Sequence, residues 1–274
     1  MTNLDKSVTQ QRIEALATEL RLPTVRRIYH RLSQEVTHQG GDYEAYLAAI
    51  LGEEASDRTA RRIERRIKEA RFPQAKLLCD LDYSAESMPP QAQVNELASG
   101  EYIEAGTNVI AVGNSGTGKT HLITGLGFEA CRQGRRVRFY PVAMLAAELQ
   151  AAQDEHQLHR YLARFAKLDL VILDELGYLP LGQSGAELLF QAISVRHERG
   201  SLGITSNLPF SEWTEVFHSE RLTSTILDRV THRAVILAMN GPSYRLRQTL
   251  ALGTEREAQE APEAPEAQET GVGP

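Results

Sequence analysis

Residues 113–120 are Gly-Asn-Ser-Gly-Thr-Gly-Lys-Thr, and they directly follow a strand-like apolar run, NVIAV, at residues 108–112. They match the phosphate-binding pattern G-x-x-x-x-G-K-[ST] at every fixed position. The segment from His121 to Cys131 has a helical pattern that Gly134 closes. Glycines in such a loop allow backbone N–H groups to turn toward phosphate oxygens at the start of a helix. The strand, loop and helix together predict a nucleoside triphosphate site, in preference to a glycine-rich turn without a ligand.

Two side chains of this loop have separate expected tasks. Lys119 is expected to reach the β- and γ-phosphates, and the Thr120 hydroxyl is expected to hold Mg²⁺. The other loop residues are expected to act mainly through their backbone amides. The residues expected to contact the nucleotide are Gly113, Asn114, Ser115, Gly116, Thr117, Gly118, Lys119, Thr120 and His121.

The composition of the chain is ordinary for a globular protein. Its 274 residues, 42% hydrophobic and 24% charged, suffice for one or two packed domains. No apolar run reaches the length of a membrane span, and residues 1–16 lack the apolar core of a secretory signal. Cys79 and Cys131 do not have the spacing of a metal site. We therefore expect a cytoplasmic protein that has no membrane partner.

The net charge of −6 conceals two segments of opposite charge. Residues 251–274 contain six glutamates and one arginine, a net charge of −5, and they have almost no aliphatic side chains. This composition predicts a disordered acidic tail, without which the net charge is only −1. Residues 58–76 contain eight Lys and Arg against two Glu, a local net charge of +6. The overall negative charge therefore does not exclude a nucleic-acid partner.

The chain divides into three predicted regions. Residues 1–90 are expected to form a small all-helical domain, residues 91–250 an α/β domain, and residues 251–274 the tail. In the α/β domain, strands alternate with helices, which predicts a parallel central sheet covered on both faces. The predicted strands are 108–112, 136–140, 169–173, 202–206 and 234–238.

Four helices are predicted in the N-terminal region. Pro23 separates the first two, and Thr24 is expected to cap the second. The third is expected to begin at Asp42, and the fourth to begin near Ser56 and end before Pro73. Beyond them we expect a linker at 80–92 and, among the helices of the α/β domain, segments 92–103 and 184–199.

The fourth predicted helix carries a row of cations on one side. On a helical wheel this row lies opposite an apolar side that includes Ile63 and Ile67. Such a row suits the phosphate backbone of duplex DNA, but it suits an ordinary solvated face equally well, and the sequence does not decide between the two. The row consists of Arg58, Arg61, Arg62, Arg65 and Lys68.

Two acids follow the apolar run LVIL at residues 170–173. A buried parallel strand would place Asp174 and Glu175 at its carboxyl edge, where ligands bind in open α/β sheets. There Asp174 is expected to hold Mg²⁺, and Glu175 to orient and polarise the attacking water. Asn207 ends the next predicted strand and is expected to sense the γ-phosphate; its alternative role is a turn or cap before Pro209.

Two arginines beyond the core strands are candidates for contact with the γ-phosphate. Phosphoryl transfer needs positive charge there, and an arginine from a neighbouring subunit can raise turnover by about 10³–10⁵-fold. Arg229 and Arg245 are the candidates for this task. An ordinary surface ion pair is the alternative for each of them, and Arg221 and Arg233 are nearby competitors.

Five motifs together support a resemblance to a known family. They are GNSGTGKTHL at 113–122, LDELGYLPL at 173–181, TSNLPFSEW at 205–213, ILDRV at 226–230 and GPSYRL at 241–246. With Leu22-Pro23 and RIKEARFP at 66–73, they make the chain similar to IstB-type ATPases over about residues 10–250. IstB-type ATPases are helper proteins of insertion-sequence transposases. They belong to the AAA+ P-loop NTPases, in the branch that also contains the replicative helicase loader DnaC.

The resemblance implies an ATP-hydrolysing AAA+ protein of the bacterial cytoplasm that uses ATP and Mg²⁺. It places Asn207 at the first sensor, Arg229 at the trans-acting arginine finger and Arg245 at the second sensor. It also implies ATP-dependent homo-oligomers on duplex DNA, formed with little sequence preference. These oligomers would deform the DNA and recruit the cognate transposase until hydrolysis dissolves them.

Two other functions remain open at this point. A DnaC-like loader would use the N-terminal helices to grip a replicative helicase instead of DNA, and the nucleotide motifs serve both functions. The LPFSEW and SYRL segments and the arginine-rich helix favour the transposition helper. A nucleotide-dependent binding module without hydrolysis is the third alternative, which the presence of Asp174, Glu175 and Asn207 disfavours.

Overall fold

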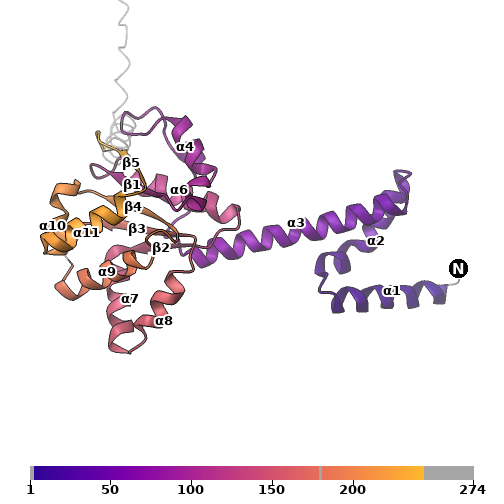
Figure 1. The fold of residues 1–274 in the computed structure, drawn as a ribbon. Coiled ribbons are helices and arrows are strands. Elements are labelled where there is room, and N and C mark those ends of the chain that lie inside the picture. The colour runs from indigo at the N-terminus through magenta and orange to yellow at the C-terminus, as the bar shows by residue number, and fades with distance from the viewer. Residues whose placement is uncertain (1–2, 179–180, 244–274) are drawn as a thin grey trace, which may run out of the picture.

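The computed structural model describes residues 3–178 and 181–243, and its centre is a five-stranded sheet. The strands lie in the order β2-β3-β4-β1-β5 (Figure 1), and every pairing is parallel. The α/β class with a parallel central sheet is therefore confirmed. The strands are β1 (Asn108–Val112), β2 (Val137–Pro141), β3 (Leu170–Leu176), β4 (Ser201–Ser206) and β5 (Ala234–Ala238).

Alternate residues of the strands face two separate apolar clusters. Successive side chains of a strand point to opposite faces of its sheet. In β3, Leu170 and Ile172 belong to one cluster, whereas Val171 and Leu173 belong to the other. Burial on both faces explains why β1 and β3 contain the unbroken aliphatic runs VIAV and LVIL.

Helices cover both faces of this sheet (Figure 1). The phosphate loop opens α6, so the loop lies at the carboxyl edge of the sheet, next to the end of β1. One face is covered by α4 (Gln91–Ala98), α5 (Glu101–Glu104), α6 (Lys119–Arg132) and the end of α3 (Tyr43–Ala70). The other face is covered by α7 (Val142–Asp154), α8 (Leu158–Phe165), α9 (Gln183–Ser194), α10 (Trp213–Phe217) and α11 (Glu220–Thr231).

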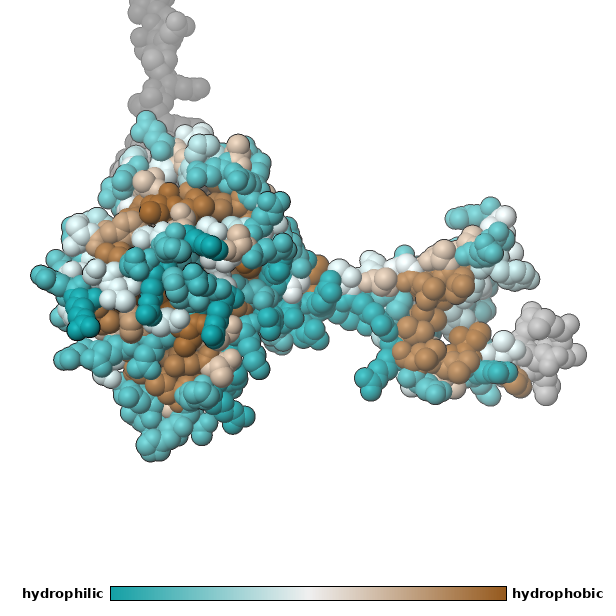
Figure 2. Space-filling model, in the orientation of Figure 1, coloured by the Kyte–Doolittle hydropathy of each residue, from teal (hydrophilic) through white to brown (hydrophobic). Residues whose placement is uncertain are grey.

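The N-terminal helices stand away from the sheet. α1 (Asn3–Glu19) and α2 (Pro23–His38) pack at the far end of α3 (Figure 1), and Figure 2 shows apolar side chains gathered where these three helices meet. α3 begins directly after Asp42, where a helix was predicted to begin, and the Asp42 side chain caps it by accepting a hydrogen bond from the Ala45 amide. It then continues for 28 residues, so the predicted break near Ser56 is wrong. Alanine, glutamate and arginine dominate this stretch and favour an uninterrupted helix.

A buried carboxylate joins α3 to α2. Glu54, only 3% exposed, accepts hydrogen bonds from the backbone amides of Thr24 (2.9 Å) and Val25 (3.1 Å) and from Arg58 Nε (2.8 Å). Burial raises the pKa of Glu54, but these hydrogen bonds outweigh burial and hold the pKa below its usual value. The predicted cap at Thr24 is therefore wrong. α2 begins at Pro23, whose fixed φ suits the first helical position, and Glu54 satisfies the amides that follow.

Two helices of the sheet domain differ from their predicted extents. The helix predicted over 92–103 is divided at Gly100, whose φ of +81° lies in the left-handed region. The helix predicted over 184–199 ends at Ser194. Turns follow it, and Glu198 there has a φ of +58°, which a helix does not contain.

The expectations about the tail, membrane spans, cysteines and domain boundary can be compared with the structure only over the described residues. The predicted tail at 251–274 lies outside the described residues. Over residues 3–178 and 181–243, no helix has the length and apolar character needed to cross a membrane. Both cysteines are free thiols, and burial raises the pKa of Cys131 to about 12. The domain boundary at residue 90 stays a prediction, because α3 itself extends from α2 to the sheet.

Candidate nucleotide site

The loop between β1 and α6 depends on glycine at two points. Gly113 has a φ of +151°, and a Cβ atom there would lie 2.1 Å from the carbonyl oxygen of Met239. Gly116 has a φ of +82°, and a Cβ atom there would lie 2.1 Å from Ser243 Oγ. A side chain at either position would displace the adjacent segment, residues 239–243 of the same chain. The loop thus has the tight, glycine-lined shape that accommodates a phosphate group.

The first residue of α6 is the buried cation Lys119, which is 6% exposed. Its Nζ donates hydrogen bonds to the carbonyl oxygens of Gly113 (2.8 Å) and Asn114 (2.6 Å). Burying an ammonium group is costly unless it is hydrogen-bonded, so these carbonyl groups fix the charge beneath the loop. Gly113 and Asn114 thereby contribute to the site by positioning the lysine.

Hydroxyl groups from two elements hold the carboxylate of Asp174. Thr120 Oγ1 (2.8 Å) and Thr205 Oγ1 (2.6 Å) both donate to Asp174 Oδ1. Thr205 Oγ1 in turn accepts a hydrogen bond from the backbone amide of Glu175 (2.9 Å). The structure therefore brings Thr120 and Asp174, the two predicted metal-holding residues, into direct contact. Thr205 was not predicted as a site residue. Its position two residues before Asn207, on the strand that pairs with β3, could have indicated it.

Glu175 lies where β3 is irregular. Its φ is +62°, which is uncommon for a residue other than glycine. The register between β3 and β4 shifts between Leu173 and Leu176, so the pairing skips this position. The Glu175 side chain is exposed and borders the cavity over the phosphate loop. Backbone strain of this kind is concentrated at functional sites.

A cavity of about 480 Å³ lies over the phosphate loop. Lys119, Thr120, Glu175 and Asn207 all border it, so four residues predicted from three separate motifs surround one space. This arrangement agrees with the expectation that the carboxyl ends of β1, β3 and β4 meet at the ligand. The loop residues that line the cavity are Ser115, Gly116, Thr117, Gly118, Lys119, Thr120 and His121.

The segment before α4 forms another wall of this cavity. Residues 74–88 contribute Lys76 and Met88, among others, to its lining. His121 Nε2 lies 2.8 Å from the Leu77 carbonyl oxygen, and this contact ties the segment to α6. The predicted linker therefore takes part in the site. No motif or periodicity marks this segment in the sequence, so sequence reasoning did not find it.

The oxygen donors of the site suit Mg²⁺. Thr120 supplies a hydroxyl and Asp174 a carboxylate, and Mg²⁺ in such sites usually keeps several waters and takes its other ligands from substrate phosphates. In the described part of the chain, no group of three His, Cys, Asp or Glu side chains could hold a metal ion. The Thr120 hydroxyl and the Asp174 carboxylate, which are in contact, fit the expected Mg²⁺, and a bound nucleotide would supply further oxygen ligands.

Arg229 lies away from the nucleotide cavity of its own chain. It lines a second, smaller cavity together with Asn108 and Leu202, which lie at the starts of β1 and β4. The nucleotide cavity lies at the opposite ends of the same strands. Arg233 borders the smaller cavity as well, whereas Arg245 lies outside the described residues.

The predicted DNA-contacting cations lie along α3, and acids of the same helix pair with three of them. Two of these acids, Glu54 and Asp57, lie before residue 58 and therefore outside the segment whose net charge is +6. Among the described residues, Arg62 and Lys68 form no ion pair, and both are exposed. The pairs are Arg58–Glu54 (2.8 Å), Arg61–Asp57 (3.4 Å) and Arg65–Glu69 (4.0 Å).

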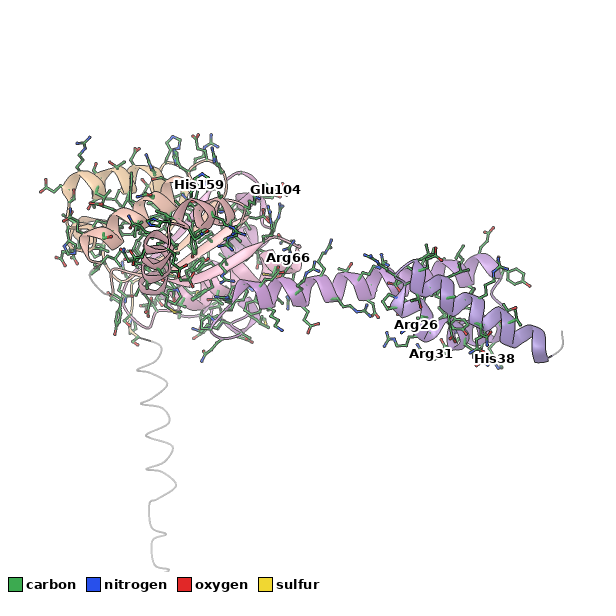
Figure 3. All side chains as sticks on the ribbon, turned by 90° about the horizontal axis from the view of Figure 1, so that it is seen from below. Arg26, Arg31, His38, Arg66, Glu104 and His159 are labelled. Carbon is green, nitrogen blue, oxygen red and sulfur yellow. The ribbon has the colours of Figure 1, made fainter. Side chains whose placement is uncertain are left out.

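Arginines and histidines outside the predicted row lie on the neighbouring helix. Figure 3 shows Arg26, Arg31 and His38 along α2, and Arg66 where α3 meets the sheet domain. Arg31 lies 3.6 Å from Glu35, and both side chains are largely exposed. Exposed pairs of this kind contribute little to stability, and Arg26 and Arg31 are exposed arginines outside the predicted row.

The sequence matches the model of the IstB-like ATP binding protein family over residues 15–251. An insertion sequence ATP-binding protein of Sinorhizobium fredii is 36% identical over 91% of this chain and 84% of that protein. The insertion sequence IS21 ATP-binding protein of Pseudomonas aeruginosa is 35% identical over 88% of this chain and 91% of that protein. The solved structure of DnaI is 19% identical over 61% of this chain and 89% of that chain, with a TM-score of 0.49. The family match bears out the expected AAA+ P-loop fold and ATP binding, and this chain belongs to the IstB-like ATP binding protein family.

Proposed function

We propose that this protein hydrolyses ATP and uses the nucleotide to control its own assembly on duplex DNA during transposition. The observation that carries the hydrolysis step is the cavity bordered by Lys119, Thr120, Glu175 and Asn207. A cation, a metal-holding hydroxyl, an acid and an amide around one space are the groups that phosphoryl transfer to water requires.

Each of these side chains has one task in the proposed reaction. Glu175 orients the attacking water and accepts its proton, because its carboxylate is exposed to the cavity. The Asn207 amide holds the same water and senses the γ-phosphate. Lys119 supplies positive charge at the β- and γ-phosphates. Mg²⁺, when bound by Thr120 and Asp174, neutralises charge on the phosphate oxygens.

A second copy of the chain is proposed to complete the site. Arg229 lies near the starts of the strands and the cavity lies at their ends, a separation of about 17 Å for a five-residue strand. Arg229 therefore serves the ATP that a neighbouring subunit binds. ATP stabilises this interface by recruiting the arginine, and hydrolysis weakens the interface again.

The N-terminal helices are proposed to contact the DNA. In the part of the chain that the structure describes, Arg62 and Lys68 form no ion pair. The side chains of the paired arginines Arg58, Arg61 and Arg65 are at least half exposed. Contacts to phosphates carry no sequence information, so the preferred DNA sequence is weakly defined. Relatives of this chain are proteins of insertion sequences, which supports a role in which the assembly deforms target DNA and recruits the transposase.

Assembly on random-sequence duplex DNA tests this proposal, with sedimentation and electron microscopy as the measurements. We expect ordered multimers that need both ATP and DNA. Replacing Arg62 and Lys68 together by alanine should reduce the salt dependence of DNA binding by about two phosphate contacts, whereas Arg132→Ala on α6 should not. A protein that stays small on DNA, and assembles only with an added replicative helicase, would instead be a helicase loader.

Thr205→Val is expected to lower ATP turnover by about 10- to 100-fold with little change in ATP affinity. Valine keeps the shape but removes the hydroxyl that links Asp174 to the Glu175 amide. Steady-state hydrolysis and nucleotide titration measure the two quantities. Thr124→Val is the matched control, because the buried Thr124 hydroxyl has no hydrogen-bond partner within residues 3–178 and 181–243. Equal turnover in both variants would show that the link has no role in hydrolysis.

A further inference from the structure

The guanidinium group of Arg229 is held by two side chains of α9. Its Cζ atom lies 4.7 Å from the centroid of the Phe190 ring, which places the cation over the aromatic face. Its Nη1 donates a hydrogen bond to Ser194 Oγ. Ser194 Oγ itself donates to the Phe190 carbonyl oxygen (2.6 Å), so its lone pairs are left to accept from the arginine. The ring and the hydroxyl together fix both the place and the plane of the guanidinium.

The two helices that carry these side chains, α9 and α11, are packed firmly against each other. Phe190 and Ser194 are four residues apart on α9 and therefore lie on the same side of that helix. α9 packs against α11, the helix that carries Arg229. Ile193 and Ile226, which belong to these two helices, are at most 2% exposed in a shared apolar cluster. Close packing of this kind holds the two helices in one relative position.

The arginine keeps its charge in this position. In the described ranges Arg229 forms no ion pair, and only one of its five N–H groups has a recorded acceptor. A π face and a hydroxyl orient a cation without neutralising it, whereas a carboxylate would compete with phosphate. The charged and titratable groups that border the same small cavity are Arg196, His197, Glu198, His232 and Arg233.

We propose that Phe190 and Ser194 are positioning residues for Arg229. They hold its guanidinium ready for the γ-phosphate of the ATP bound by a second copy of the chain. This inference rests on the proposed function, in which Arg229 acts on a neighbouring site. A long arginine side chain loses rotamer freedom when it binds, and holding it in advance reduces that loss in the assembled state.

The alternative is that Phe190 and Ser194 only pack α9 against its neighbours. Phe190 does lie against the apolar cluster, and serine hydroxyls commonly bond to the carbonyl one turn earlier. A packing role would not depend on the side chain at position 229. A positioning role would disappear once Arg229 is gone, and this difference separates the two explanations.

The test is a double-mutant cycle in the full-length protein. Phe190→Leu keeps an apolar side chain but removes the aromatic ring. Phe190→Tyr keeps the aromatic ring. Ser194→Ala removes the hydroxyl that accepts from Arg229. Each is made with Arg229 present and with Arg229→Ala. ATP turnover and ATP-dependent assembly on DNA are measured at saturating ATP, with thermal unfolding as the control for stability.

With Arg229 present, we expect Phe190→Leu to lower turnover about 3- to 30-fold at unchanged KM for ATP. Phe190→Tyr, which keeps the aromatic ring, should retain the turnover of the parent. Ser194→Ala should lower turnover in the same direction. With Arg229→Ala, neither Phe190→Leu nor Ser194→Ala should have a further effect. Equal losses in both backgrounds, or parent-like turnover in Phe190→Leu, would overturn the positioning role alone. Parent-like turnover in Arg229→Ala itself would overturn the proposed function instead.

Discussion

Glu175→Gln is expected to lower ATP hydrolysis by about 10²–10⁴-fold while ATP and DNA binding remain. Glutamine keeps the size of the side chain but cannot accept the proton of the attacking water. The hydrogen bond from the backbone amide of residue 175 to the Thr205 hydroxyl does not involve the substituted side chain and stays in place. Because hydrolysis is proposed to dissolve the assembly, the variant should persist on DNA after the parent has dissociated. Turnover and the lifetime of the complex after a challenge with competitor DNA measure the two effects.

Glu155→Gln is the matched control for this variant. Glu155 is exposed and follows α7 at the end remote from the cavity, so its loss of charge should change neither quantity. A Glu175→Gln variant that hydrolyses ATP at the parent rate would place the general base elsewhere. One that fails to hydrolyse, yet dissociates at the parent rate, would separate hydrolysis from disassembly and end the timing role.

Arg229→Ala is expected to lower turnover by about 10³–10⁵-fold and to abolish ATP-dependent multimers. The site in each chain stays intact, since Arg229 borders a different cavity. The affinity of the monomer for ATP should therefore stay close to that of the parent. Arg221→Ala is a suitable control because Arg221 lies on the same helix at its opposite end and borders neither of these two cavities.

A mixing experiment shows on which site the arginine acts. Lys119→Ala lacks the phosphate-binding cation but still offers Arg229, whereas Arg229→Ala has a complete phosphate loop. Each variant alone should be nearly inactive. If Arg229 acts on a neighbouring subunit, equimolar mixtures regain turnover, because some Arg229→Ala sites then face an intact arginine. Mixtures that stay inactive, while still assembling, would contradict the proposed action between subunits.

The sheet and the phosphate loop could be predicted because their signals are local. The buried strands β1 and β3 contain short aliphatic runs, and the loop needs glycine where φ is positive, as at Gly113 and Gly116. The parallel order then brings the ends of β1, β3 and β4 together. For this reason Asp174, Glu175 and Asn207 could be placed near Lys119 from separate motifs.

Other parts of the site depend on contacts between distant residues. The strained backbone at Glu175 follows from the register shift against β4, which no local pattern shows. The wall formed by residues 74–88 likewise exists because His121 meets the Leu77 carbonyl group. The cap of α2 comes from Glu54, thirty residues after Thr24. Sequence spacing cannot reveal such partners, since each one is selected by the folded geometry.

Because α3 is one continuous helix anchored in the sheet domain, a small rotation at its anchored end displaces its other end by a larger distance. Its last residue, Ala70, is fully buried in the cluster under α6, and its first half packs against α2. A helix of 28 residues is about 42 Å long, so a tilt of about 10° at the buried end moves the far end by about 7 Å. A rearrangement around the nucleotide that tilts α3 by this angle would therefore be enlarged at α1 and α2.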